Sequence, residues 1–144
     1  MMWLRKSKKG FTLIELMVVV AIIGVLALLG LRLYTGQQAK AKEAIVKANA
    51  GTVQTLIQSE LADGSLSLTD CVTVAKGAGL HNPFTGNAMT NDSDFPTGTI
   101  SPQADSPGEI EIIEIVSGVV SGVKFEIRGY GAKGLIFEKL TAQR

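Results

Sequence analysis

The feature that most constrains this chain is an uninterrupted apolar run over residues 11–31. Its sequence is FTLIELMVVVAIIGVLALLGL, and Glu15 is the single charged residue in it. About 20 consecutive apolar residues, at a helical rise of about 1.5 Å each, are enough to cross the hydrocarbon core of a bilayer. We therefore predict a transmembrane helix over these residues.

The residues before the run are basic and contain no acid; the cations are Arg5, Lys6, Lys8 and Lys9. Because positively charged flanks stay in the cytoplasm, we expect a single-pass inner-membrane precursor whose N-terminus is cytoplasmic. A cleaved secretory signal peptide is the competing interpretation. It is disfavoured because the run exceeds the usual hydrophobic region of roughly 7–15 residues and no A-x-A-like site ends it.

The acid inside the apolar run needs a physical explanation. A charged side chain at the centre of a membrane helix costs about 2.5–3.5 kcal/mol on insertion scales, and such acids usually have a partner and a function. A cut after Gly10 would create an α-amine on Phe11, four residues before Glu15. That amine on a neighbouring subunit could pair with Glu15, and the pair would be strong only with both charges present. The alternative is an acid near the interface that snorkels or is protonated.

Residues 9–24, KGFTLIELMVVVAIIG, resemble the signature of type IV prepilins and type II secretion pseudopilins, and the match extends over residues 8–29. The resemblance implies that a prepilin peptidase cleaves between Gly10 and Phe11 and that the new amine of Phe11 is N-methylated. It also implies that Glu15 is the family's acidic residue, which pairs with the N-terminus of a neighbouring subunit in a helical filament.

One position departs from the pattern that this resemblance implies. Type IVa pilins usually carry a proline where this chain has Arg32. Proline removes a helical hydrogen bond and kinks the helix, so its absence removes that source of flexibility. Gly24 and Gly30 remain as the candidate flexible positions, since each glycine costs about 1 kcal/mol relative to alanine in a helix interior.

Beyond residue 31 the apolar residues recur every three or four positions, which is typical of an amphipathic helix with one buried face. We therefore expect one helix over residues 11–62, with a membrane or filament-core half at 11–31 and an amphipathic half at 32–62. Asp63-Gly64 predicts a left-handed cap at its end. The head, residues 63–144, is small and should bury its apolar face against this helix. The prediction is an α+β, pilin-like lollipop, which the resemblance also implies.

Within the head, residues 63–108 read as loop and one short helix, Ser67–Gly77, with Asp70 completing a capping box. Residues 109–144 read as an antiparallel sheet of three to four strands. The predicted strands are Glu109–Val116, Val123–Arg128 and Gly134–Leu140. The neighbours Ile112 and Ile113 break the alternation, which indicates a bulge or burial on both faces.

The sequence contains no catalytic motif, and we expect no enzyme activity. The lone Cys71 excludes an intrachain disulfide and a multi-cysteine metal site, so packing is its expected role. We interpret His81 as a solvated loop residue. Asp92 and Asp94 are weak calcium candidates, because they lack EF-hand spacing and its distal Glu. We therefore expect no cofactor, with calcium as the single weak alternative.

Charge is segregated along the chain: residues 32–62 sum to +2 and residues 63–144 to −4, within a total of +1. No dense basic patch is present, so we predict no specific nucleic-acid partner.

The resemblance implies the structural subunit of an extracellular type IV pilus, with roles in adhesion, motility or DNA uptake. Its implied partners are further copies of the chain, a prepilin peptidase, the inner-membrane assembly platform and, before assembly, the lipid bilayer. The alternative is the major pseudopilin of a type II secretion system, which is periplasmic and shares the leader motif. A single-pass, membrane-anchored binding domain is less favoured, because it explains neither Lys9-Gly10-Phe11 nor Glu15.

Overall fold

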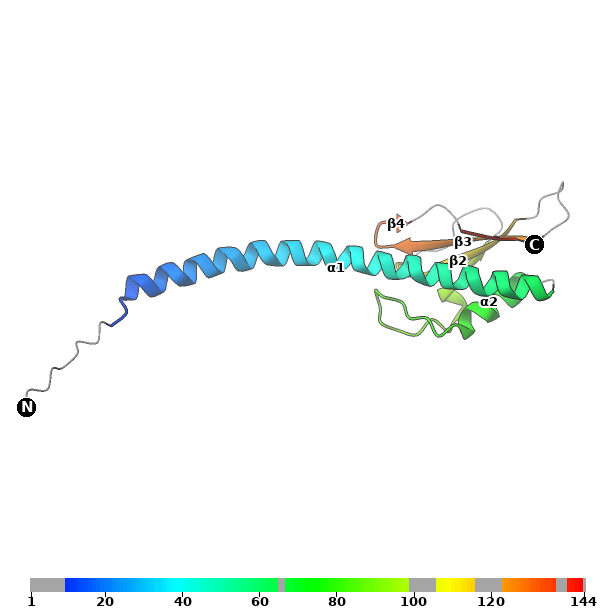
Figure 1. Ribbon diagram of the computed structural model, residues 1–144, viewed down its shortest axis with the longest axis horizontal. Coiled ribbons are helices and arrows are strands. Elements are labelled where there is room, and N and C mark those ends of the chain that lie inside the picture. The colour runs from blue at the N-terminus through cyan, green and yellow to red at the C-terminus, as the bar shows by residue number, and fades with distance from the viewer. Residues whose placement is uncertain (1–9, 65–66, 99–105, 116–122, 137–139, 144) are drawn as a thin grey trace, which may run out of the picture. The chain divides into compact units, whose positions relative to one another are not determined.

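The computed structural model describes residues 10–64, 67–98, 106–115, 123–136 and 140–143. It divides into two compact units, residues 1–38 and residues 39–144, which we call the N-terminal unit and the head unit. Helix α1 (Leu13–Asp63) has 51 residues and contributes to both units (Figure 1). The prediction of one helix over residues 11–62 is therefore confirmed to within two residues at each end.

In the N-terminal unit, every described residue from 10 to 38 is exposed. The helix here contains a segment long and apolar enough to cross a membrane, and none of that segment is buried. The leucine, isoleucine and valine side chains of this segment are exposed and are not covered by other described residues. Burying an apolar side chain of this size is worth about 1.5–3 kcal/mol, so this surface requires a cover.

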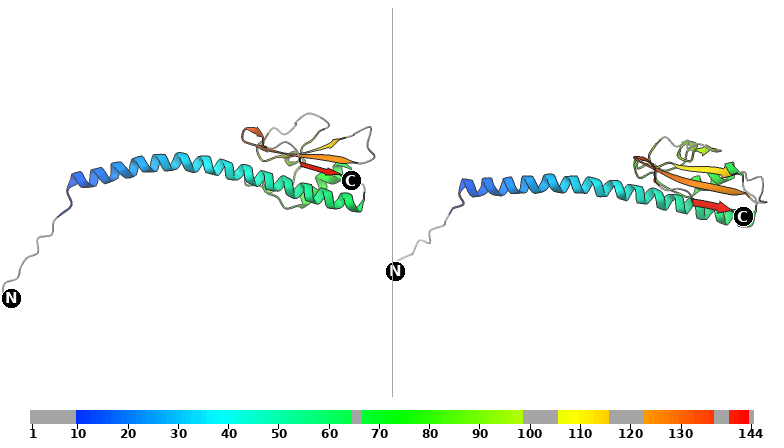
Figure 2. Two further views of the ribbon diagram at one scale, coloured as in Figure 1. Left: turned by 45° about the horizontal axis from the view of Figure 1, so that its top comes forward. Right: turned by 90° about the horizontal axis from the view of Figure 1, so that it is seen from above.

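The head unit places a mixed sheet and a second helix against the remainder of α1 (Figures 1 and 2). Its further elements are α2 (Leu68–Gly77), the 3-10 helix η1 (Asp92–Asp94), β1 (Thr97–Gly98), β2 (Ile110–Ile115), β3 (Lys124–Gly131), β4 (Gly134–Leu135) and β5 (Leu140–Gln143). Strand β3 pairs antiparallel with β2, β4 and β5, while β1 pairs with β2 in parallel.

The sheet corrects two of the sequence predictions. It is mixed and not antiparallel, because β1 joins it in parallel, and the described part holds five strands where three to four were predicted. Strand β1 has only two residues, too few to show an alternating pattern. The predicted strand at 134–140 corresponds to two short strands, β4 and β5, of which β5 begins at Leu140.

The break in alternation at Ile112 and Ile113 marks burial on both faces of β2. Both side chains are buried, and the pairing of β2 with β3 runs without interruption from Ile110 to Ile115. The alternative prediction of a bulge is therefore wrong, because a bulge would place two residues opposite one.

The core of the head lies between the C-terminal half of α1 and the sheet. Helix α1 contributes buried residues every three or four positions: Val46, Ala50, Val53, Ile57 and Leu61. The sheet contributes Ile110, Ile112, Phe125, Ile127 and Ala142, and the segment between them adds Cys71, Ala75, Met89 and Phe95. The amphipathic pattern thus predicts the buried face of α1 from Val46 to Leu61, but Ile45, which belongs to the same pattern, is 47% exposed.

Polar side chains of α1 also hold the edge of the sheet. The amide of Gln54 donates to the carbonyl of Thr141 at 2.9 Å, and that of Gln58 donates to the carbonyl of Gln143 at 2.8 Å. The Gln58 side-chain oxygen accepts in turn from the backbone N–H of Gln143 at 3.1 Å. These bonds satisfy backbone groups of β5 that lie next to the helix.

The cap predicted at the start of α2 is present, whereas the cap predicted at the end of α1 is not. The capping box of α2 is confirmed: Ser67 N–H donates to Asp70 at 3.0 Å, and Ser67 Oγ accepts from Asp70 N–H at 3.3 Å. The Ser67 hydroxyl also donates to the Asp70 carboxylate at 2.6 Å, and this bond, followed by that from the Ser67 N–H, lowers the pKa of Asp70. The left-handed cap predicted at Gly64 is wrong, because its φ is not positive and its N–H donates to the carbonyl of Glu60 at 3.1 Å.

Candidate functional site

The start of α1 is organised by a hydrogen-bonded pair, Thr12 and Glu15. The backbone N–H and the hydroxyl of Thr12 each donate to Glu15 Oε2 at 2.8 Å. The backbone N–H of Glu15 donates back to Thr12 Oγ1 at 3.3 Å. This is a capping box, in which Thr12 is the N-cap and Glu15 lies three residues into the helix. The Thr-x-x-Glu spacing was the sequence signal for it, and the sequence reasoning missed Thr12.

The capping box fixes the Glu15 carboxylate close to the residues at which processing is predicted. Gly10 and Phe11 lie just before the box, and the Phe11 side chain is 80% exposed. Phe11, Ile14, Glu15, Val18 and Val19 line a shallow, almost entirely apolar hollow on the helix surface. The carboxylate therefore sits at the edge of an apolar face, where water competes little for it once that face is covered. The leader cations Arg5, Lys6, Lys8 and Lys9 lie outside the described residues.

The candidate flexible positions lie within unbroken helix. Helix α1 continues through Gly24, Gly30 and Arg32. A Cβ added at either glycine would meet no described atom within 4 Å. Packing inside this chain therefore does not require glycine at positions 24 and 30, and their effect here is on helix propensity alone.

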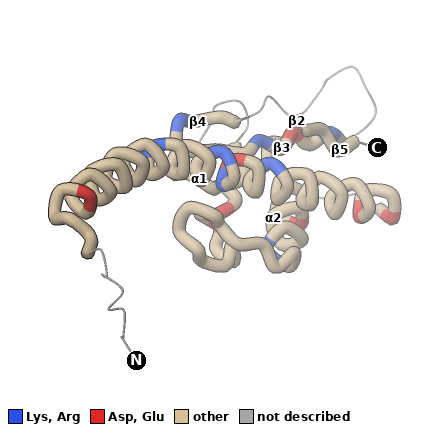
Figure 3. The backbone as a smooth tube through the Cα atoms, turned by 60° about the vertical axis from the view of Figure 1, so that its left-hand side comes forward, with Lys and Arg blue, Asp and Glu red and all other residues tan. Residues whose placement is uncertain are grey.

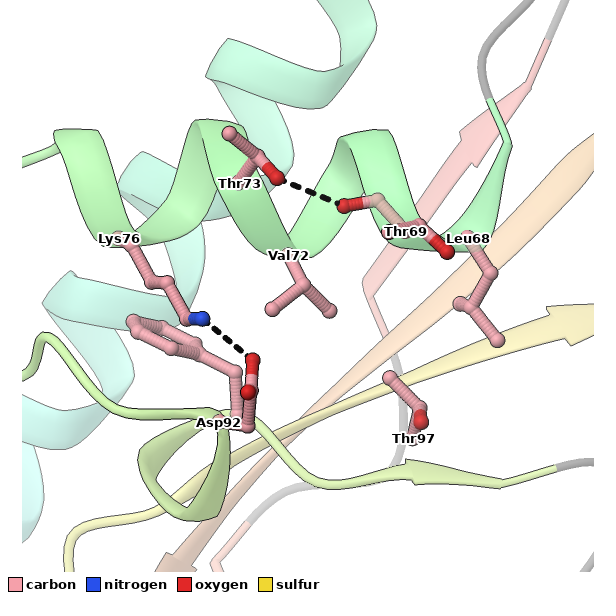
Figure 4. A pocket seen from close by; sticks show the side chains of 8 residues that line it. Leu68, Thr69, Val72, Thr73, Lys76, Asp92 and Thr97 are labelled. Carbon is pink, nitrogen blue, oxygen red and sulfur yellow. Dashed lines mark hydrogen bonds and ion pairs between the residues drawn. The ribbon is translucent and has the colours of Figure 1, made fainter.

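The head contains a small pocket between α2 and the segment that carries η1 and β1 (Figure 4). Its volume is about 280 Å³. One face of α2 supplies Leu68, Thr69, Val72, Thr73 and Lys76, and the opposite wall supplies Asp92, Phe95 and Thr97. Lys76 forms an ion pair with Asp92 across it, and the Thr73 hydroxyl donates to the Thr69 carbonyl at 3.0 Å. These charged and hydroxyl groups thus have their ionic or hydrogen-bond partners within the pocket lining.

The two weak calcium candidates already have structural partners. Asp92 pairs with Lys76. The Asp94 carboxylate accepts from the backbone N–H groups of Thr90 at 3.1 Å and Asn91 at 2.9 Å, so it caps η1. Within the described ranges, no group of three or more His, Cys, Asp or Glu side chains lies close enough to hold a metal ion.

Cys71 and His81 lie in different environments. Cys71 is fully buried in the core, and burial, with the nearby charges of Asp70 and Glu114, raises the pKa of its thiol to about 12. A thiol with such a pKa is not a nucleophile at neutral pH. His81 is exposed, and its carbonyl accepts from the Asn49 side chain at 3.0 Å. In the described structure, Cys71 therefore lies in the core and His81 lies at the surface.

A buried polar network lies on β2 and β3, which the sequence reasoning did not identify. Tyr130 donates its hydroxyl to the buried Glu111 at 2.9 Å, and burial together with this bond raises the pKa of Tyr130 to about 12. Arg128 lies opposite Glu111 in the register, 3.8 Å from it, and pairs with Glu126 at 2.6 Å. Positions 126, 128 and 130 share one face of β3, so their alternation was the available signal.

Comparison with known proteins agrees with this geometry. A profile described as "Prokaryotic N-terminal methylation motif" matches residues 5–31, the region that contains Gly10, Phe11 and Glu15. A fimbrial protein of Eikenella corrodens is 48% identical over 64 residues, which are 44% of this chain and 40% of the relative. A type IV major fimbrial protein of Dichelobacter nodosus is 32% identical over 106 residues, 74% of this chain and 60% of the relative.

A longer alignment also includes the head. A type IV major pilin protein of Neisseria gonorrhoeae is 33% identical over 131 residues, 85% of this chain and 64% of the relative. The chain thus spans 40% and 60% of the first two relatives' own lengths. No solved structure matches the chain significantly. The chain therefore carries the N-terminal methylation motif, has an α+β, pilin-like architecture and is homologous to type IV fimbrial and pilin proteins.

Proposed function

We propose that this chain is the structural subunit of a type IV pilus filament. The observation that carries the proposal is the exposed apolar surface of α1 in the N-terminal unit. Its large apolar side chains cannot remain in water, because each costs about 1.5–3 kcal/mol there relative to a covered site. The bilayer covers them in the precursor, and the helices of neighbouring copies cover them in the filament.

The residues at the start of α1 supply the processing and assembly steps of this proposal. A prepilin peptidase cleaves between Gly10 and Phe11 on the cytoplasmic side, where the leader cations hold the N-terminus. The new amine of Phe11 is methylated. The Glu15 carboxylate then pairs with the Phe11 amine of a neighbouring copy in a low-dielectric setting, which favours only subunits in the correct axial register. An inner-membrane platform would drive the assembly.

The filament is extracellular, and its heads take part in adhesion, motility or DNA uptake. The relatives compared above are named as fimbrial or pilin proteins, which favours a pilus over the pseudopilus of a type II secretion system.

The proposal is tested by the share of the protein in a sheared filament fraction from its own cells. Glu15→Gln keeps the shape of the side chain and removes the charge. Losing one partner of a buried charge pair costs about 3–5 kcal/mol, so the filament share should fall at least roughly tenfold. Glu43→Gln, on the head-unit part of the same helix, is the control and should not lower the share, because it leaves the charge at the start of α1 intact. A membrane-anchored receptor would be absent from the fraction and indifferent to Glu15→Gln.

A further inference from the structure

In the head unit, the basic residues of α1 lie near its start, and the acidic residues Glu60 and Asp63 lie at its end (Figure 3). The exposed lysines Lys40 and Lys47 lie on the first turns of α1 in this unit. Lys133 lies in the turn between β3 and β4, and this turn is near the same part of α1. A Cβ on Gly131 would come within 3.3 Å of Glu43 Cγ. We call this the basic end of the head.

The acidic end lies at the opposite end of the same unit. Glu60 and Asp63 are exposed on the last turn of α1, and Asp70 is exposed on the first turn of α2. Glu114 lies at the same end, because the adjacent Ile115 of β2 pairs with Lys124, and Lys124 pairs with Gln143, which is hydrogen-bonded to Gln58 of α1. Residues 47 and 60 of α1 are separated by roughly 20 Å along the helix axis.

At each end of the head, the charges of one sign outnumber those of the opposite sign. The described residues of the basic end comprise four lysines against two acids, the lysines being Lys40, Lys42, Lys47 and Lys133 and the acids Glu43 and Glu109. At the acidic end, the charged residues that the structure describes are the acids Glu60, Asp63, Asp70 and Glu114 and the base Lys124. The ion pairs of the described head, Lys76–Asp92 and the Arg128 pairs, include none of these residues.

A parallel filament would bring the two ends together. Its subunits point the same way because their apolar helices pack in one orientation, so all the heads share one polarity. A copy displaced along the α1 axis of the head unit by about the length of the head, roughly 35 Å for residues 40–63 at 1.5 Å each, sets its basic end against the acidic end of the first copy. Complementary charge then fixes which surfaces meet and disfavours contact between like ends.

We propose that the acidic end of one head docks on the basic end of another copy of this chain along the filament. The inference rests on the proposed pilus function and assigns the contact between heads within it. A single exposed ion pair contributes little. Each head, however, takes part in two such contacts, one through each end, and the contacts repeat along the whole filament.

Charge reversal in the full-length chain, expressed in its own cells, tests the docking. The first variant, Lys40→Glu with Lys47→Glu, reverses the basic end, and the second, Glu60→Lys with Asp63→Lys, reverses the acidic end. Each should lower the protein's share in the sheared filament fraction roughly tenfold, which is about 1.4 kcal/mol per contact. The quadruple variant carries both reversals and should return to within about twofold of the wild type, because opposite charges again face each other.

Two controls separate docking from folding and from net charge. The thermal midpoint of each variant should equal that of the wild type, since all four positions are exposed. The neutral pair Lys40→Gln with Lys47→Gln should show a smaller loss in the same direction. Positive charge added between the ends, Thr52→Lys with Thr55→Lys on the Lys40→Glu, Lys47→Glu background, should not restore filaments.

The outcomes for the inference and for the proposed function differ. A filament share unchanged by reversal of either end overturns the docking, while the pilus function stands. A quadruple variant as poor as the single-end variants also overturns it. Absence of the wild-type chain from the filament fraction contradicts the proposed function itself.

Discussion

The carboxylate of Glu15 accepts two hydrogen bonds from Thr12, one from its backbone N–H and one from its hydroxyl, both at 2.8 Å. The acid that looks out of place in an apolar run is therefore satisfied within a single chain. It caps the N-terminus of α1, where the helix dipole also favours a negative charge. The Glu15 carboxylate, which the filament proposal requires, is thus held near Phe11 by contacts within a single chain.

Removing the Thr12 hydroxyl should loosen the first turn of α1. Thr12→Val removes the acceptor for Glu15 N–H, and loss of an N-cap costs about 1 kcal/mol, or about fivefold in local opening. Amide hydrogen exchange at Glu15 and Leu16, measured by NMR in detergent micelles, should accelerate by that factor. Thr35→Val is the control, since the Thr35 hydroxyl donates to the Arg32 carbonyl in mid-helix at 3.0 Å. Equal effects of both variants would contradict a capping role.

Gly108 should be irreplaceable in the head. Its φ is +95°, and an added Cβ would lie 2.1 Å from Asn82 Oδ1. That oxygen accepts from Phe84 N–H at 2.8 Å, so the loop depends on its position. Gly108→Ala should lower the free energy of unfolding by more than about 2 kcal/mol, through backbone strain and the collision together.

Gly86 supplies the matched comparison for that prediction. Its φ is +78°, but a Cβ there would meet nothing within 4 Å among the described residues. Gly86→Ala should therefore show the backbone effect alone, about 1 kcal/mol. Denaturant unfolding followed by circular dichroism measures both. A Gly108→Ala loss no larger than that of Gly86→Ala would show that the contact with Asn82 is unimportant.

Tyr130→Phe should destabilise the head although it preserves the ring. The substitution removes the hydroxyl donated to Glu111, a carboxylate that is fully buried. Weakening the satisfaction of a buried acceptor costs about 1–3 kcal/mol. Tyr34→Phe is the control, because Tyr34 is exposed in the N-terminal unit. Thermal unfolding of the two variants should separate them by several degrees, and coincident midpoints would argue against the network.

The head should lose stability at alkaline pH. The pKa of Cys71 is about 12 in the folded head against a reference of 9.0, so the unfolded thiol releases its proton first. Its contribution is complete below pH 9 and disappears as the pH rises from 9 to about 12. The free energy of unfolding, measured across this range, should fall less steeply in Cys71→Ala. The remaining slope includes Tyr130, whose pKa is also raised. Identical slopes would contradict the burial of the thiol.

Local sequence patterns predicted the helical parts of this protein well. The apolar run, the three-to-four-residue spacing from Val46 to Leu61 and the Ser67–Asp70 box each depend on neighbours within one helix. These interactions form between residues that are close in sequence, so the local sequence pattern is enough to predict them. The same Thr-x-x-Glu spacing at Thr12–Glu15 predicts a capping box, which sequence reasoning that treats the acid only as a membrane charge does not find.

The parts that sequence predicted poorly depend on contacts between distant segments. Strand β1 exists only because Thr97 and Gly98 pair with Ile112 and Ile113. Glu126 alternates with the buried Phe125 and Ile127 of β3, yet Glu126 is itself buried beside Arg128. Alternation distinguishes the two faces of a strand, but it does not reveal which faces become covered.

The most direct test of the central claim is the intact mass and N-terminal residue of the chain recovered from sheared filaments. We expect this chain to begin at Phe11, to carry one added methyl group on its amine and to be abundant in the filament fraction. A chain that begins before residue 11 and is confined to the membrane would contradict both the processing and the filament role.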